Sequence, residues 1–177
     1  MNHALTEKLA RVEASEARLG GVRLDYMREM AALGSAVFER MEAFGALAHQ
    51  QGMLKPEQAA IIRFATLGAI QADDCGECVQ IHVNLDRAAG TDPALLRLAL
   101  ARQPEKLPPA YGLAWRLGQA VARNADDMEE LRQELEAIIG RAAMFELGFA
   151  LACMRVYPTL KRATGYALSC SKVEIAA

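Results

Sequence analysis

The sequence has little of the material from which β-sheets are built. Only 6% of its 177 residues are aromatic, and its hydrophobic fraction of 53% comes mainly from Ala and Leu, not from Val and Ile. Ala and Leu favour helices, whereas β-branched and aromatic residues favour strands. No strand-length run alternates apolar and polar residues, and no Asn-Gly pair marks a tight hairpin. The sequence therefore predicts an all-α protein.

The chain also lacks an excess of basic charge. Its 20 Lys and Arg residues stand against 22 Asp and Glu residues, which gives a formal net charge of −2. Nucleic acids and anionic membranes bind basic faces, so we expect neither as a partner. No window reaches about 18 uncharged apolar residues, and the apolar run 147–157 is interrupted by Arg155. The first residues have no apolar signal-peptide core, so we expect a cytoplasmic protein.

Helical spacing and turn residues divide the chain into helices that suit one compact helical bundle. We expect a single domain over residues 1–177, whose first 20 residues form a peripheral helix before a Gly-Gly break. Pro158 should separate the last two helices. The predicted helices are 4–18, 24–49, 56–71, 74–89, 93–102, 110–124, 128–139, 142–157 and 159–168.

Cysteine is scarce, yet two of the four cysteines lie in the stretch DDCGECVQIH. We predict that Asp73 and Asp74 cap a helix on which Cys75, Cys78 and His82 share one face, because they are spaced by three and four. Helix position favours a thiolate at Cys75, whereas contact with His82 favours Cys78 as the nucleophile. Of the two we favour Cys78. In a reducing compartment such a pair is more often catalytic or metal-binding than structural.

Two other interpretations of these residues stay open. Cys75, Cys78 and His82 supply three ligands for zinc, but a structural zinc site needs a fourth, and no second ligand pair of recognisable spacing follows. Isolated cysteines are also common as inert buried residues. Here Glu77 and Gln80 keep the surroundings polar, which argues against an inert role.

The spacing Cys-x-x-Cys-x-x-x-His, followed by NLDRAAG, resembles the carboxymuconolactone decarboxylase family, and within it the alkylhydroperoxidase D-like branch. The similarity begins at LKPE, so residues 54–177 would be the family-like core, and it continues into the apolar run before Pro158. The resemblance implies an all-α homo-oligomer, either a trimer or hexamer or a dimer, without a cofactor. It further implies that Cys75 and Cys78 cycle between dithiol and disulfide and that His82 relays protons.

The sequence departs from this branch at one position. The branch carries a glutamate twelve residues before its first cysteine, where this chain has Arg63. A guanidinium near the thiols would lower their pKa directly, so Arg63 is a candidate thiolate stabiliser. Glu77 is a candidate base, although at i+2 from Cys75 it lies on another face of the helix.

The leading functional expectation is an antioxidant peroxidase or thiol–disulfide oxidoreductase, with a small peroxide as substrate and an external dithiol as reductant. One alternative is a decarboxylase-like enzyme, in which His82 and a basic residue handle a small anionic substrate and the cysteine pair is superfluous. Another alternative is a non-catalytic oligomeric helical protein. Cys153 and Cys170 lack a Cys or His at helical spacing, so we expect them to be structural.

Overall fold

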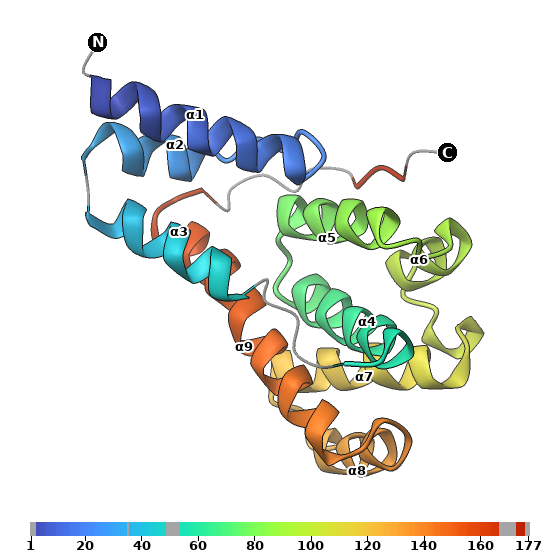
Figure 1. Ribbon diagram of the computed structural model, residues 1–177. Coiled ribbons are helices and arrows are strands. Elements are labelled where there is room, and N and C mark those ends of the chain that lie inside the picture. The colour runs from blue at the N-terminus through green and yellow to red at the C-terminus, as the bar shows by residue number, and fades with distance from the viewer. Residues whose placement is uncertain (1–2, 35, 49–53, 167–172, 176–177) are drawn as a thin grey trace.

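The computed structural model describes residues 3–34, 36–48, 54–166 and 173–175, and all the regular elements among these residues are helices (Figure 1). The all-α prediction is confirmed. No helix in these segments is both long and apolar enough to cross a membrane. The elements are α1 (His3–Arg18), α2 (Asp25–Ala32), α3 (Ala36–Ala48), α4 (Pro56–Ala72), α5 (Gly76–Ala88), α6 (Pro93–Leu100), the 3-10 turn η1 (Pro104–Lys106), α7 (Pro109–Arg123), α8 (Met128–Ile139) and α9 (Arg141–Ala163).

Helix α4 lies at the centre of the main hydrophobic core, as its apolar sequence predicts. It packs against α7 at very short range, because Gly68 of α4 and Gly118 of α7 each face the backbone of the opposite helix. A side chain at either position would clash with that backbone. Two side-chain hydrogen bonds join the same helices: Trp115 Nε1 donates to Gln71 Oε1 at 2.7 Å, and Gln119 Nε2 donates to Gly68 O at 2.8 Å. The α4–α7 pair is therefore a rigid support for the helix that follows α4.

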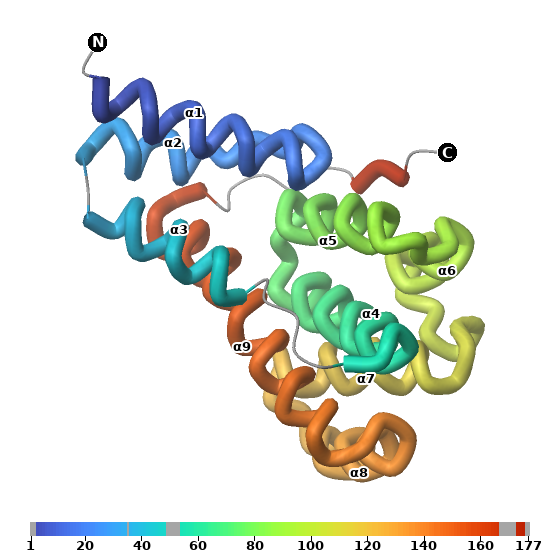
Figure 2. Tube along the Cα trace, in the orientation of Figure 1, coloured from blue at the N-terminus to red at the C-terminus, as the bar shows by residue number. Residues whose placement is uncertain are grey.

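The first three helices form a second, smaller apolar cluster. Figure 2 shows α1 and α2 side by side and α3 beside α9. Ile81 of α5, Leu160 of α9 and Tyr166 pack against this cluster, so the N-terminal helices lie against the cysteine helix and the end of α9. The buried members of the cluster are Val12, Leu24, Tyr26, Met27, Ala31 and Phe38.

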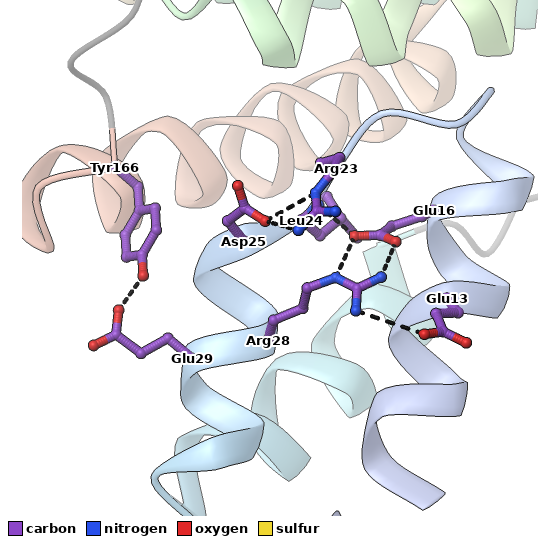
Figure 3. Close-up of polar contacts among 8 residues, drawn as sticks. All are labelled: Glu13, Glu16, Arg23, Leu24, Asp25, Arg28, Glu29 and Tyr166. Atoms are coloured by element: carbon purple, nitrogen blue, oxygen red, sulfur yellow. Dashed lines mark hydrogen bonds and ion pairs between the residues drawn. The ribbon is translucent and has the colours of Figure 1, made fainter. Parts of the chain in front are cut away.

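A partly buried ion pair joins α1 to α2 (Figure 3). Glu16 Oε1 accepts hydrogen bonds from Arg28 Nε at 3.0 Å and from the backbone N–H of Leu24 at 2.7 Å. The hydrogen bond from Arg28 is the main reason that the pKa of Glu16 lies below its ordinary value. In the same view the Tyr166 hydroxyl donates to Glu29, which connects the segment after α9 to α2.

Two predicted helix boundaries are wrong. The run 24–49 is not one helix, because Gly34 adopts a left-handed φ of 64° between α2 and α3, and Leu33 beside it is 72% exposed. Pro158 does not end a helix, because α9 continues through it to Ala163. Thr159 Oγ1 donates to Arg155 O at 2.7 Å, which supplies a hydrogen bond in the turn that the proline disturbs.

Candidate active site

The cysteine pair lies where α4 ends and α5 begins. Asp73 is the C-cap of α4, Asp74 has a left-handed φ of 51°, and Cys75 is the N-cap of α5. The backbone N–H of Val79 donates to Cys75 O at 2.9 Å, the first hydrogen bond of the helix. The prediction that the two aspartates cap α5 is therefore wrong, because the reversal between the helices uses both of them and shifts the helix start to the cysteine.

Cys75 and Cys78 form a disulfide, with their Cα atoms 5.3 Å apart. This separation lies within the ordinary range for a disulfide. The N-cap residue and the third helical residue face each other at a helix start, since an N-cap side chain normally reaches the third backbone N–H. The bond therefore closes inside the first turn of α5, as the spacing of three predicts.

His82 follows Cys78 by one helical turn, and the structure places all three predicted residues on the buried side of α5. Cys75, Cys78 and His82 are 5%, 6% and 7% exposed, and both cysteines belong to the main core. Because residues four apart on a helix lie on the same side, His82 and Cys78 share this side of α5. A thiol pair and an imidazole thus share one sheltered face, which is a suitable arrangement for proton transfer to and from sulfur.

Glu77, the candidate base, is engaged elsewhere. Its carboxylate forms an ion pair with Lys161 of α9, whose side chain is buried at 4% exposure and whose Nζ lies 5.8 Å from the ring centroid of Tyr26. Gln80 exchanges two hydrogen bonds with the backbone of Glu174. Its Nε2 donates to Glu174 O at 2.8 Å, and the Glu174 N–H donates to its Oε1 at 2.6 Å. The outer side of α5 is therefore held by α9 and by residues 173–175.

The connection before the cysteines is fixed by two arginines of α9. Arg155 Nε lies 3.0 Å from Asp73 Oδ2, and its guanidinium also donates to Ala122 O at 3.1 Å. Arg162 donates to the backbone carbonyl of Asp73. Arg155, which interrupts an apolar stretch in the sequence, thus has a structural partner two residues before Cys75.

Arg63, the candidate thiolate stabiliser, pairs with a residue that the sequence reading missed. Its Nε lies 3.3 Å from Oδ1 of Asp86, a carboxylate that is only 1% exposed. Burial raises the pKa of Asp86 to about 7, against the opposing effect of Arg63. A signal for Asp86 was present in the sequence, because residue 86 continues the spacing of three and four that runs through Cys75, Cys78 and His82.

The two cysteines outside the pair are Cys153 and Cys170. Cys153 is buried in α9, and burial raises the pKa of its thiol. Cys170 lies outside the described residues. Within them, no three or more His, Cys, Asp or Glu side chains are grouped so that they could hold a metal ion, so the zinc interpretation gains no support.

Comparisons with family models, with curated proteins and with solved structures find no match to this chain. The resemblance to the alkylhydroperoxidase D-like branch therefore remains a prediction from the cysteine–histidine motif.

Proposed function

We propose that this chain is a thiol–disulfide oxidoreductase of the alkylhydroperoxidase D-like type, which reduces small peroxides through Cys75 and Cys78. The observation that carries the proposal is a closed disulfide at the start of α5 with His82 one turn further along the same buried face. A decarboxylase acting on a small anion would need neither the second sulfur nor its position opposite the first.

In the proposed cycle the Cys78 thiolate attacks one oxygen of the peroxide ROOH. The O–O bond breaks, the sulfur becomes a sulfenic acid, and the other oxygen leaves as ROH after gaining a proton. The Cys75 thiolate then attacks the sulfenic sulfur, the S–O bond breaks, the hydroxide that leaves gains a proton to become water, and the Cys75–Cys78 disulfide forms. An external dithiol reduces this disulfide by exchange, so two electrons pass from the dithiol to the peroxide.

The two cysteines have different environments that suit these steps. His82 adjoins Cys78, so it takes the proton of that thiol and returns it to the leaving oxygen. Cys75 is the N-cap, where the free backbone N–H groups of the first turn stabilise a negative sulfur. Cys78 is accordingly the attacking residue and Cys75 the resolving one.

The low exposure of both sulfurs favours a small peroxide over a bulky substrate. The proposal places the protein in the cytoplasm, where external dithiols keep such pairs reduced. It also includes assembly into a homo-oligomer, as the motif resemblance implies.

Thiol titration with and without hydrogen peroxide tests the proposal. The reduced protein should lose two thiols per chain on exposure to a small excess of peroxide and regain them with dithiothreitol. In Cys75→Ser and Cys78→Ser no disulfide should form, whereas the matched control Cys153→Ser should behave like the wild type. Survival of both thiols in excess peroxide would overturn the proposal, and turnover of a lactone acid without thiol consumption would favour the decarboxylase.

A further inference from the structure

Asp86 lies in an environment that is energetically unfavourable for a carboxylate. Both of its carboxylate oxygens are enclosed by protein, and neither has a hydrogen-bond partner among the described residues. Arg63 Nε lies 3.3 Å from its Oδ1, close enough for an ion pair but without the alignment of a hydrogen bond. A buried carboxylate in such a setting destabilises a fold unless it is protonated or fully paired. A structural role explains this arrangement poorly.

The position of Asp86 links it to the redox pair. Cys78, His82 and Asp86 follow one another at intervals of four residues on the buried side of α5. One such interval advances about 6 Å along a helix, which a carboxylate and an imidazole span together through one bridging water molecule. The three side chains therefore form a continuous row of sulfur, imidazole and carboxylate.

The charges that act on Asp86 come from two helices. From α4, Arg63 faces it and favours its ionised form. On α5 itself, the titratable or charged neighbours are His82 one turn before and Arg87 next in the chain. The end of α1 touches α5 through Asn84, a neutral residue whose amide donates to Leu19 O at 2.9 Å.

We propose that Asp86 is a positioning residue for His82, and that Arg63 sets how readily Asp86 carries its charge; this inference rests on the proposed function. The carboxylate holds the imidazole so that its far nitrogen faces Cys78, and it stabilises the imidazolium formed when His82 takes the thiol proton. The imidazolium passes this proton to the leaving oxygen of the peroxide. Asp86 keeps its own charge through the cycle, in the manner of a carboxylate behind a catalytic histidine.

The dependence on charge gives the proposal a signature in pH. Because burial raises the pKa of Asp86 to about 7, Asp86 becomes protonated and loses its negative charge in mildly acidic solution. The rate at which peroxide oxidises the reduced pair should then fall below about pH 7. If Asp86 were purely structural, protonation of His82 and of the thiols would set the acid limb alone, and the limb would not move when Asp86 or Arg63 is replaced.

The test is the single-turnover rate of disulfide formation with hydrogen peroxide, measured from pH 5 to pH 9 by quenched thiol titration. Asp86→Asn should slow the reaction at pH 8 at least about tenfold and move the acid limb to lower pH. Arg63→Met should move the limb to higher pH, because Arg63 favours the ionised carboxylate. Opposite displacements by the two variants are not expected from general damage to the fold.

The matched controls are Glu16→Gln and Arg28→Met, which alter a partly buried carboxylate–arginine pair in α1 and α2 (Figure 3). Both should keep the wild-type limb. An identical limb in Asp86→Asn, Arg63→Met and the wild type would overturn the inference. If Asp86→Asn does not fold, the displacement in Arg63→Met alone decides.

The inference and the proposed function fail in different ways. Wild-type protein that loses no thiols to peroxide contradicts the function. The row is then tested by the pH dependence of iodoacetamide alkylation of Cys78 in Cys75→Ser. Asp86→Asn in that background should shift alkylation of Cys78 to higher pH, because the thiolate loses its stabilised imidazolium partner. An unchanged alkylation profile would overturn the inference by itself.

Discussion

Replacing Asp86 with Asn should stabilise the oxidised protein relative to the wild type increasingly as the pH rises from 5 to 8. The folded protein holds the proton of Asp86 up to about pH 7, whereas the unfolded chain releases it near the ordinary value of 3.8. Between these values the folded state binds more protons than the unfolded state. The free energy of unfolding contributed by Asp86 therefore falls as the pH rises through this window. Asn carries no titrating proton and escapes this loss.

The size of the effect follows from the two pKa values. At about 1.4 kcal/mol per pKa unit, ionisation of Asp86 costs the wild type about 2 to 3 kcal/mol of unfolding free energy between pH 5 and pH 8. The difference between Asp86→Asn and the wild type should grow by this amount over the interval. Urea denaturation of the oxidised proteins, followed by circular dichroism at each pH unit, measures it.

Glu16→Gln is the control of opposite sign. The pKa of Glu16 is lowered by Arg28, so its contribution is fully present above the ordinary carboxyl value and is lost only as the pH falls through the folded value. The deficit of Glu16→Gln should therefore be constant from pH 5 to pH 8. A constant difference for Asp86→Asn over the same interval would refute the reasoning, since Asp86 would then stay ionised in the folded protein, as it is in the unfolded chain.

Two further predictions concern packing and pairing, and both are read from urea unfolding at pH 7. Glu77→Gln should lower the free energy of unfolding by about 1 to 2 kcal/mol more than Lys161→Met does, because it leaves the buried Lys161 ammonium without its carboxylate. In Lys161→Met the carboxylate of Glu77 is left unpaired, but it is one-third exposed and can be hydrated. Equal costs of the two variants would contradict this. Gly118→Ala should cost about 2 to 3 kcal/mol, because the new methyl group meets the backbone of Ala65. Gly148→Ala, where no atom lies within 4 Å of the added group, should be neutral or stabilising by up to about 1 kcal/mol; a cost similar to that of Gly118→Ala would refute the packing argument.

Most helices could be predicted from the sequence because glycines and prolines mark their ends. Asp92, for example, caps α6 as expected, with Oδ1 accepting from the Ala94 N–H at 2.7 Å. The break at Gly34 was missed because the apolar spacing runs on across it, and only the backbone conformation reveals the turn. Pro158 was predicted to end a helix, because proline lacks the N–H that a helix interior uses. The helix α9 nevertheless continues through it.

Part of the candidate site could also be predicted. The shared face of Cys75, Cys78 and His82 follows from spacing along one helix, which is local information. The pairing of Arg63 with Asp86 joins residues 23 positions apart, on two helices, and depends on how α4 and α5 pack. No local pattern contains that distance. The engagement of Glu77 by Lys161 is equally a tertiary contact, 84 positions apart in the sequence.

The N-cap position of Cys75 couples the oxidation state of the pair to the helix it begins. In the disulfide form α5 starts without a side-chain hydrogen bond to its first N–H groups. A thiolate at the same place accepts from them, so reduction adds a helix cap that oxidation removes. A contact that stabilises the first turn of α5 more in the reduced form than in the disulfide form therefore favours reduction and makes the disulfide a stronger oxidant. The reduction potential of this protein is in this sense a property of a helix end as much as of two sulfur atoms.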